Sequence, residues 1–216
     1  KIPERPSRRF QSQSGHGRLS FRHTLRQMTR NCGLAIPVYK SPFPRPRPLV
    51  VICDISGSMD RYSRALLRFI HALTQKHGGV HSFLFGTRLT NISRQMQGRD
   101  PDAALRDVSQ LVEDWSGGTR ISSAIASFNR LWSRRVLGQG AVVMLITDGL
   151  DRDTDSNLGF ETERLHKSCA SLIWLNPLLR FDGFEPLSSS IQQILPHVDA
   201  FVPIHSLDSM ADLASV

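Results

Sequence analysis

The strongest constraint on the fold is the stretch from residue 49 to residue 59, where an apolar run ends in a cluster of small oxygen donors. The run itself, residues 49–53, is typical of a parallel strand that is buried on both faces. Asp54, Ser56 and Ser58 follow it at alternate positions. An open α/β sheet places its binding crevice at the carboxyl ends of its strands. The stretch therefore predicts an α/β fold with a site at this edge of the sheet.

Two later stretches supply matching donors. Residues 115–120 read Trp-Ser-Gly-Gly-Thr-Arg, in which the glycines allow close approach of the backbone and Thr119 adds a hydroxyl. Residues 141–149 are an apolar run that ends in Thr-Asp-Gly. Hydroxyl and carboxylate oxygens suit a hard cation such as Mg²⁺ or Mn²⁺ better than a soft metal. Oxygen donors of this kind are supplied by Asp54, Ser56, Ser58, Thr119 and Asp148.

The remaining pattern alternates strands with helices. Strands are expected at 49–54, 80–85, 88–93, 141–147, 171–175 and 200–204, and helices at 59–77, 101–114, 122–134, 157–168 and 189–195. Strands 80–85 and 88–93 form a hairpin through a Gly-Thr turn. The sequence thus predicts a doubly wound, mostly parallel six-stranded sheet with one antiparallel edge strand and helices on both faces. A terminal turn of helix is expected after residue 204.

The basic charge of the chain is concentrated at its beginning. Residues 1–48 hold 11 Lys and Arg and a single acid, whereas residues 49–216 hold 16 basic and 18 acidic residues. We expect residues 1–48 to comprise a flexible basic arm (1–18), a short helix (20–31), a short edge strand (34–39) and a stiff proline-rich linker (42–48) that leads into a domain at 49–216. The chain begins with Lys1, which predicts a truncated front. The arm either binds nucleic acid or an acidic partner, or is a solvated piece of a longer region, and the near-neutral remainder disfavours nucleic acid.

Cysteine usage favours a reducing, cytoplasmic location. Three cysteines do not make a disulfide framework, and Cys53 is expected to be a core residue. No apolar run is long enough to cross a membrane. Two helical histidines, His71 and His77, are expected to be solvated, because neither has a second ligand at metal spacing.

Other chemistry is disfavoured by missing motifs. The nucleophile elbow Gly-x-Ser-x-Gly, the phosphate loop Gly-x4-Gly-Lys-Ser/Thr and a dinucleotide fingerprint are all absent, so the chain is not expected to be an enzyme or to take a small-molecule substrate. The acidic run 151–155 lacks the glycine and glutamate of an EF-hand, and we expect a solvated loop beside the main site.

Asp-x-Ser-x-Ser at 54–58, Gly-Gly-Thr at 117–119 and Thr-Asp-Gly at 147–149 resemble the metal-ion-dependent adhesion site of von Willebrand factor A (VWA) domains. The resemblance implies a VWA fold, with direct metal contacts from Ser56, Ser58 and Thr119. Asp54 and Asp148 would contact the ion through water. One position on the ion stays open to an acidic side chain of a partner. The alternative is a vestigial site that holds only hydrogen bonds.

A closer resemblance, over about residues 20–213, is to the CoxE-like family of bacterial VWA proteins. It is carried by Asp-Trp-Ser-Gly-Gly-Thr-Arg-Ile (114–121), Thr-Asp-Gly-Leu-Asp-Arg (147–152), Leu-Ile-Trp-Leu-Asn-Pro-Leu (172–178), Ser-Phe-Arg-His-Thr-Leu-Arg (20–26) and Leu-Pro-His-Val-Asp (195–199). CoxE-like proteins are similar to partners of MoxR-type AAA+ ATPases that mature a metalloenzyme, carbon monoxide dehydrogenase in the best-known case. The resemblance implies a non-catalytic adaptor that couples such an ATPase to its client.

Two other functions are kept as alternatives: an adhesion-type module for an extracellular ligand, and binding of nucleic acid or an acidic partner through the basic arm. The tryptophans of the family motifs, Trp115 and Trp174, are expected to pack in the core or at its rim. Arg120 would either steer an acidic partner or pair with Asp114.

Overall fold

The chain forms two compact units, a small one at residues 2–46 and a large one at residues 47–216. The computed structural model describes residues 4–13, 15–112, 118–151, 157–177 and 188–204. The expected terminal turn of helix, Trp115 and the acidic positions 153 and 155 lie outside these residues. No helix in the described part has the length and apolar character needed to cross a membrane.

The large unit is built on a six-stranded sheet with the order β6-β5-β4-β7-β8-β9. Its strands are β4 (Leu49–Asp54), β5 (Val80–Phe85), β6 (Leu89–Asn91), β7 (Val142–Ile146), β8 (Ser171–Asn176) and β9 (Ala200–Pro203). All neighbouring strands are parallel except β5 and β6, which pair antiparallel at one edge. The predicted sheet is therefore confirmed, with β4 near its middle.

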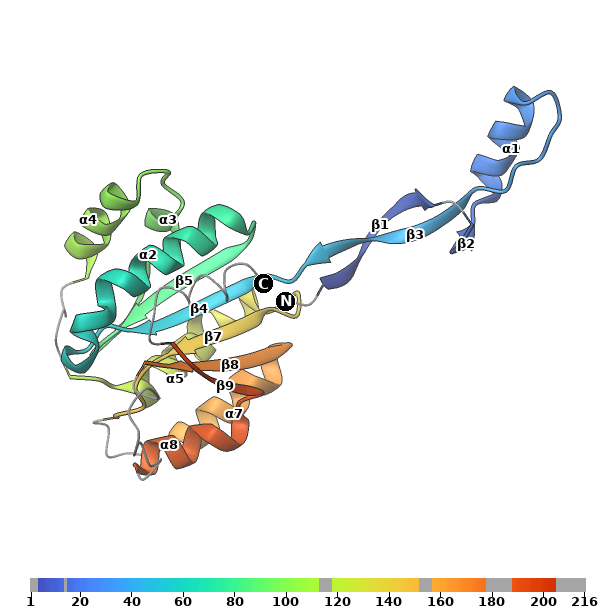
Figure 1. Cartoon of the computed structure of the whole chain (residues 1–216). Helices are drawn as coiled ribbons and strands as arrows, with labels where there is room; N and C mark the ends of the chain where they lie inside the picture. Colours follow the sequence, from blue (N-terminus) through green and yellow to red (C-terminus); the bar gives the residue numbers. More distant parts are fainter. Residues whose placement is uncertain (1–3, 14, 113–117, 152–156, 178–187, 205–216) are drawn as a thin grey trace. The chain divides into compact units, whose positions relative to one another are not determined.

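Helices cover both faces of the sheet (Figure 1). One face carries α2 (Asp60–Lys76), α3 (Ser93–Met96) and α4 (Pro101–Leu111). The other carries α5 (Ile121–Leu131), α7 (Leu158–Ser168) and α8 (Ser189–Ile194), with α6 (Ser133–Val136) following α5. Two short 3₁₀ turns, η1 (Gly57–Met59) and η2 (Leu195–His197), complete the unit. The arrangement confirms a doubly wound fold, because helices on both faces of the sheet connect its successive parallel strands.

The core lies on both sides of β4, whose six residues are all buried. Side chains alternate along a strand, so Val50 and Ile52 join the core under α5, α7 and α8. In that core Phe83 meets Phe128 edge to face, with ring centroids 5.2 Å apart. Cys53 is buried, as predicted for a core residue. The first strand of the candidate site is thus held rigidly from both faces.

His71 is not solvated, contrary to prediction. It lies on α2 with 6% of its surface exposed, and its Nε2 is 2.7 Å from the carbonyl oxygen of Gly98. The Gln75 side chain donates to the same oxygen at 2.9 Å. These contacts tie α2 to the turn between α3 and α4. The role of His71 is therefore to hold α2 against the turn between α3 and α4.

The small unit differs from the predicted arm and linker. Residues 4–13 form a strand, β1 (Glu4–Gln13), which pairs antiparallel with β3 (Tyr39–Pro46). A short strand, β2 (Arg18–Leu19), pairs with the start of β3, and α1 (Phe21–Arg30) follows it. The predicted edge strand at 34–39 does not form, because pairing begins only at Tyr39. Prolines hold the extended φ of a strand, and at alternate positions they leave the residues between them free to pair. The proline-rich run is therefore largely a strand, not a linker.

Candidate metal site

Asp54 ends β4 at the carboxyl edge of the sheet and is fully buried. Its Oδ1 accepts a hydrogen bond from the backbone N–H of Ser56 at 2.8 Å. Its Oδ2 accepts one from the Thr147 hydroxyl at 2.9 Å, across from the end of β7. The parallel register of β4 and β7, which pairs Cys53 with Ile146, brings these groups together. The Asp54 carboxylate is thus fixed in orientation by two segments of the site.

The electrostatic surroundings of Asp54 disfavour its charge. Burial raises its pKa from 3.8 to about 6, against the hydrogen bonds from Ser56 and Thr147, which lower it. The negative charge of Asp148 raises the pKa further. The two carboxylates are therefore close enough to repel each other. A cation beside them would relieve this repulsion.

Asp148 follows β7 and is also fully buried. Its Oδ1 accepts a hydrogen bond from the backbone N–H of Leu150 at 3.0 Å. Its Oδ2 is buried and has no hydrogen-bond partner within the described part of the chain. Buried carboxylate oxygens are normally satisfied by donors, water or metal. This orphaned oxygen fits a water held by a bound cation.

The loops that carry Ser56 and Thr119 are held side by side by the end of β5. The carbonyl of Phe85 accepts from the N–H of Ile55 at 2.9 Å, and the next carbonyl, of Gly86, accepts from the N–H of Arg120 at 3.0 Å. Ser56 and Thr119 have exposed fractions of 2% and 4%. Ser56 and Thr119 are therefore nearly buried residues on two loops that are joined through the end of β5. The side chain of Ser58 lies outside the described part, so its predicted role stays a prediction.

Asp151 is a site residue that the sequence did not reveal. Its two carboxylate oxygens accept from the N–H groups of Ile121 and Ser122 at 3.0 and 3.1 Å, at the first turn of α5. A carboxylate at this position accepts hydrogen bonds from N–H groups that have no partner within the helix. The positive end of the helix dipole also stabilises its negative charge. For Asp151 the expectation of a solvated loop is wrong. The cap comes from 30 residues away, so no local capping pattern marks it.

Gly149 and Trp174 shape the turn that presents Asp148. Gly149 has a φ of +82°, and a Cβ there would lie 2.9 Å from both Ile191 Cγ1 and Trp174 Cζ2. The Trp174 indole N–H donates to the carbonyl of Thr147 at 3.0 Å, and the ring is fully buried. The prediction of core packing is confirmed for Trp174. Glycine is thus required at this position of the Thr-Asp-Gly motif, because the backbone has a positive φ and because a Cβ would be too close to Ile191 and Trp174.

The donor set suits a hard cation. Within the described ranges, no three or more His, Cys, Asp or Glu side chains gather where they could hold a metal. The site instead combines two carboxylates with hydroxyls, a mixture that Mg²⁺ or Mn²⁺ accepts and that Cu(I) would not. The residues therefore fit a divalent hard cation that keeps bound waters.

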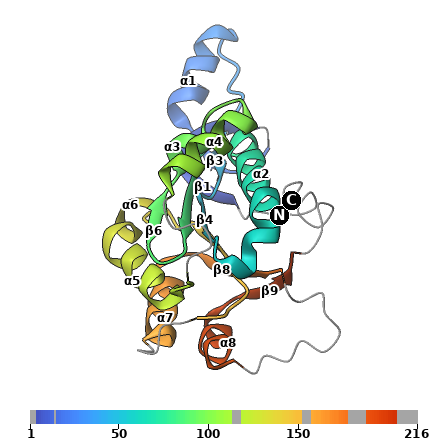
Figure 2. The ribbon, with the colours of Figure 1, turned by 90° about the vertical axis from the view of Figure 1, so that its left-hand side faces the viewer.

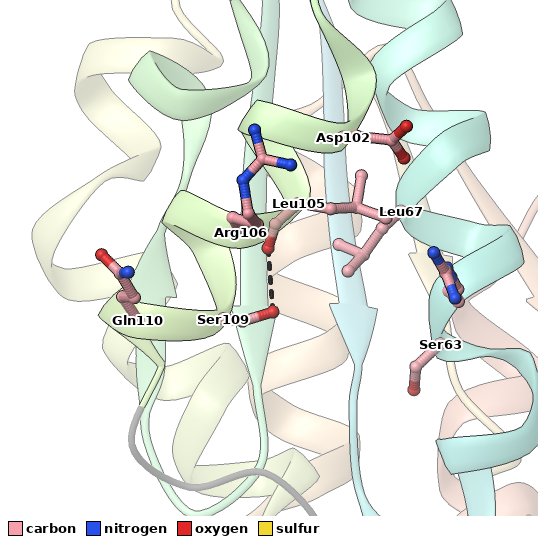
Figure 3. Close-up of a pocket in the computed structure, with 8 residues that line it drawn as sticks. Ser63, Leu67, Asp102, Leu105, Arg106, Ser109 and Gln110 are labelled. Carbon is pink, nitrogen blue, oxygen red and sulfur yellow. Dashed lines mark hydrogen bonds between the residues drawn. The ribbon is translucent and has the colours of Figure 1, made fainter.

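A groove of about 830 Å³ lies between α2 and α4, and Figure 3 shows the side chains that line it. It is lined by Ser63, Arg64, Leu67, Asp102, Leu105, Arg106, Ser109 and Gln110. The two helices run beside each other in Figure 2. The Ser63 hydroxyl donates to the carbonyl of Met59, the last residue of η1, at 3.0 Å. The groove thus begins one helical turn from the loop that carries Ser56 and Ser58.

A comparison with known protein families shows to which family the chain belongs. The family described as VWA domain containing CoxE-like protein matches residues 2–210. The chain belongs to the CoxE-like VWA family. The match includes the small unit, residues 2–46, as well as the sheet that carries the site. No curated protein matches the CoxE-like chain in a direct sequence comparison.

Solved structures share the fold of this CoxE-like chain. A von Willebrand factor type A protein from Catenulispora acidiphila has a TM-score of 0.57 and 18% identity, over 82% of this chain and 43% of its own. BatB from Bacteroides thetaiotaomicron has a TM-score of 0.51 and 16% identity, over 78% and 96%. Proximal thread matrix protein 1 from the mussel byssus has a TM-score of 0.55 and 14% identity, over 78% and 44%. The CoxE-like chain thus spans less than half the length of the first and third. At these identities the likeness shows the VWA fold alone.

One form of the mussel protein has a zinc-occupied metal-ion-dependent adhesion site motif. It has a TM-score of 0.52 and 14% identity to the CoxE-like chain, over 79% of this chain and 46% of its own. A divalent metal can therefore occupy that motif in the mussel protein.

Proposed function

We propose that this VWA domain is a non-catalytic adaptor that captures an acidic side chain of a partner protein through a divalent cation. Asp54, Ser56, Ser58, Thr119 and Asp148 hold the ion, which is Mg²⁺ or Mn²⁺. The observation that carries the proposal is the buried Oδ2 of Asp148, which has no donor in the described part of the chain and lies beside a second carboxylate. A metal-bound water satisfies that oxygen, and the ion offsets the repulsion.

The hydroxyl and the carboxylate side chains have different roles at the proposed site. Ser56, Ser58 and Thr119 contact the ion directly through neutral hydroxyls, and the two aspartates hold its waters. When bound, the ion supplies a positive charge that the hydroxyls do not neutralise, and it attracts an anionic oxygen from outside. The hydrogen bonds of Asp54 and Asp151 keep the loops in place before the partner arrives.

The partner we propose is a MoxR-type AAA+ ATPase, with a metalloenzyme as client. Membership of the CoxE-like family supports this pairing. The groove between α2 and α4 supports a protein contact beside the site, because it combines apolar Leu67 and Leu105 with two arginines and one aspartate. ATP-driven motion of the ring would then be transmitted through the adaptor to open the client for cofactor insertion. The three free cysteines support a cytoplasmic setting.

The first test is calorimetric titration of Mg²⁺ and of Mn²⁺ into the wild-type chain and into Asp54→Ala and Ser56→Ala. The wild type should bind one ion and both variants should not. Asp102→Ala is the matched control, because this aspartate lies on α4 in an exposed pair with Arg68. Failure of the wild type to bind either ion, alone or with the ATPase present, would refute the metal-dependent mechanism.

The second test is co-purification with the MoxR-type ATPase in the presence of Mg²⁺ or of a chelator. Retention should require both the metal and Asp54. Metal binding without retention of the ATPase would favour an adhesion-type module instead. Retention that neither chelator nor Asp54→Ala reduces would exclude capture through the metal.

A further inference from the structure

The small unit exposes an apolar surface and has no core of its own. Among its described residues, none is buried. Large apolar side chains are exposed throughout it: Phe10, Phe21, Leu25, Met28, Leu34, Ile36 and Phe43. Monomeric soluble proteins rarely leave such side chains grouped on one surface, and grouped ones mark an interaction site. We call the apolar side chains of α1 together with Phe10 the α1 surface.

Helix α1 turns its polar side toward the rest of the small unit. The N–H of Ser20 donates to the carbonyl of Val38 at 2.8 Å, and the hydroxyl of Thr24 accepts from the N–H of Val38 at 3.0 Å. Phe21, Leu25 and Met28 recur at the spacing of one helical face, and their exposed fractions are 71%, 60% and 37%. The apolar face of α1 is therefore exposed, and the anchoring residue Thr24 lies at one edge of that face.

A small hollow extends this surface. It has a volume of about 330 Å³ and is lined by Phe10, Leu19 and Phe21 with Ser20, Arg18, Arg22 and Lys40. Apolar walls with three cations around them suit an apolar side chain that is flanked by carboxylates. The hollow thus gives the α1 surface a place to anchor a partner.

The small unit carries a strong positive charge, which favours an acidic partner. Residues 4–46 hold nine Lys and Arg and one acid, Glu4. Arg22, Arg26 and Arg30 are four residues apart, so they form a stripe that begins beside Leu25 at Arg22 and turns gradually away from the apolar face toward Arg30. Lys40, burial, Arg26 and Arg22 together lower the pKa of His23, in keeping with a positive local field. A second copy of this surface would be repelled by the same field.

We propose that the α1 surface binds an acidic amphipathic helix of another protein. Its apolar side chains pack on Phe21, Leu25 and Met28, one of them enters the hollow, and its carboxylates pair with the arginine stripe. This interaction needs no metal and stands apart from the function proposed above. The family match over residues 2–210 places the small unit within the shared part of the family.

The test uses the full chain and two synthetic helical peptides of about 20 residues, long enough to be helical in water. Both carry leucines along one face; one has glutamates beside them and the other has lysines. Fluorescence anisotropy should show binding of the glutamate peptide alone, weakening as salt is raised. The double variant Phe21→Ser/Leu25→Ser should bind roughly tenfold more weakly or worse. Gln27→Ser, an exposed polar change on the same helix, should bind like the wild type.

A charge-reversal variant tests the electrostatic part of the proposal separately from the apolar packing. The triple variant Arg22→Glu/Arg26→Glu/Arg30→Glu should prefer the lysine peptide. The proposal is overturned if the glutamate peptide does not bind, if both peptides bind equally, or if the α1 variants bind like the wild type. Preferential binding to phosphatidylglycerol vesicles would make the surface a membrane contact and would also overturn it. So would a dimer in sedimentation that the double variant dissociates.

Discussion

Asp54 is the residue at which the electrostatic demands of the site and of the fold conflict. Its pKa is raised to about 6, chiefly by burial. The folded chain therefore favours the protonated form, and the stability from that form is complete below pH 3.8 and lost as the pH rises through about 6. At neutral pH without metal, the Asp54 charge costs on the order of 1–3 kcal/mol. The ionised Asp54 carboxylate, which the proposed cation would need, thus lowers the stability of the metal-free fold.

We therefore expect Asp54→Asn to unfold at a higher urea concentration than the wild type at pH 7 in the presence of chelator. The difference should shrink at pH 5, because the wild-type side chain is then largely protonated. Urea denaturation at both pH values measures the effect, and Mg²⁺ binding should be lost. An equal loss of stability at both pH values would mean that the hydrogen bond from Thr147 outweighs the burial of charge.

Gly149→Ala should destabilise the chain by roughly 2–4 kcal/mol. The substitution combines a positive φ with a Cβ that would lie 2.9 Å from the Trp174 ring. Gly159→Ala is the control. Gly159 lies in α7, and a Cβ there would lie 3.7 Å from its nearest neighbour, Gln193 of α8, so the variant should be neutral or stabilise by up to about 1 kcal/mol. Equal urea midpoints for the two variants would contradict the steric argument.

Single residues show where prediction from sequence succeeds. Asp54 ends β4 and Asp148 follows β7, as the strand pattern predicts, and the loops that carry Ser56 and Thr119 both hydrogen-bond to the end of β5. The metal contacts of these four residues stay a prediction. Local motifs suffice there, because parallel strands all end at that edge. Asp151 was missed, because its partners lie 30 residues away in sequence.

At the scale of elements, Asp151 connects the loop after β7 to the first turn of α5. Asp151→Ala should lower stability by about 1 kcal/mol, the usual cost of a lost helix cap. It should also weaken Mg²⁺ binding roughly tenfold, because the freed turn carries Thr119. Calorimetry and urea denaturation measure the two effects.

A second cap provides the control for that experiment. Asp100 accepts from the N–H of Asp102 at the start of α4, at 3.0 Å. Asp100→Ala should cost similar stability and leave Mg²⁺ affinity unchanged. If both variants weaken metal binding equally, the effect reflects general loss of stability and not the Asp151 contact.

Elements also explain one family motif. In the run 195–199, the Asp199 carboxylate accepts from the N–H of Leu172 at 2.7 Å and lies 3.1 Å from His166 Nε2. It therefore joins the start of β8 to α7, and its role is structural.

The small unit was predicted less well than the sheet. A proline-rich run resembles a linker in isolation, and only pairing with residues 4–13 makes it a strand.

For the whole molecule, the division into two units has a measurable consequence. Every buried apolar side chain of the described residues lies between positions 49 and 204. A fragment of residues 47–216 should therefore fold alone, with a Tm within about 3 °C of the full chain and the same Mg²⁺ affinity. Calorimetry of the fragment and the full chain tests this. A fragment that fails to fold would show that residues 2–46 stabilise the sheet.

The loops of the candidate site are shaped by hydrogen bonds between protein groups: Ser56 to Asp54, Leu150 to Asp148, and Ile121 to Asp151. None of these bonds uses a metal ion. Under the proposed function, a variant that lacks the hydroxyl of Ser56 or Thr119 would lose the ion and keep these hydrogen bonds. The proposed metal-dependent contact can therefore be lost through single substitutions that leave the protein folded.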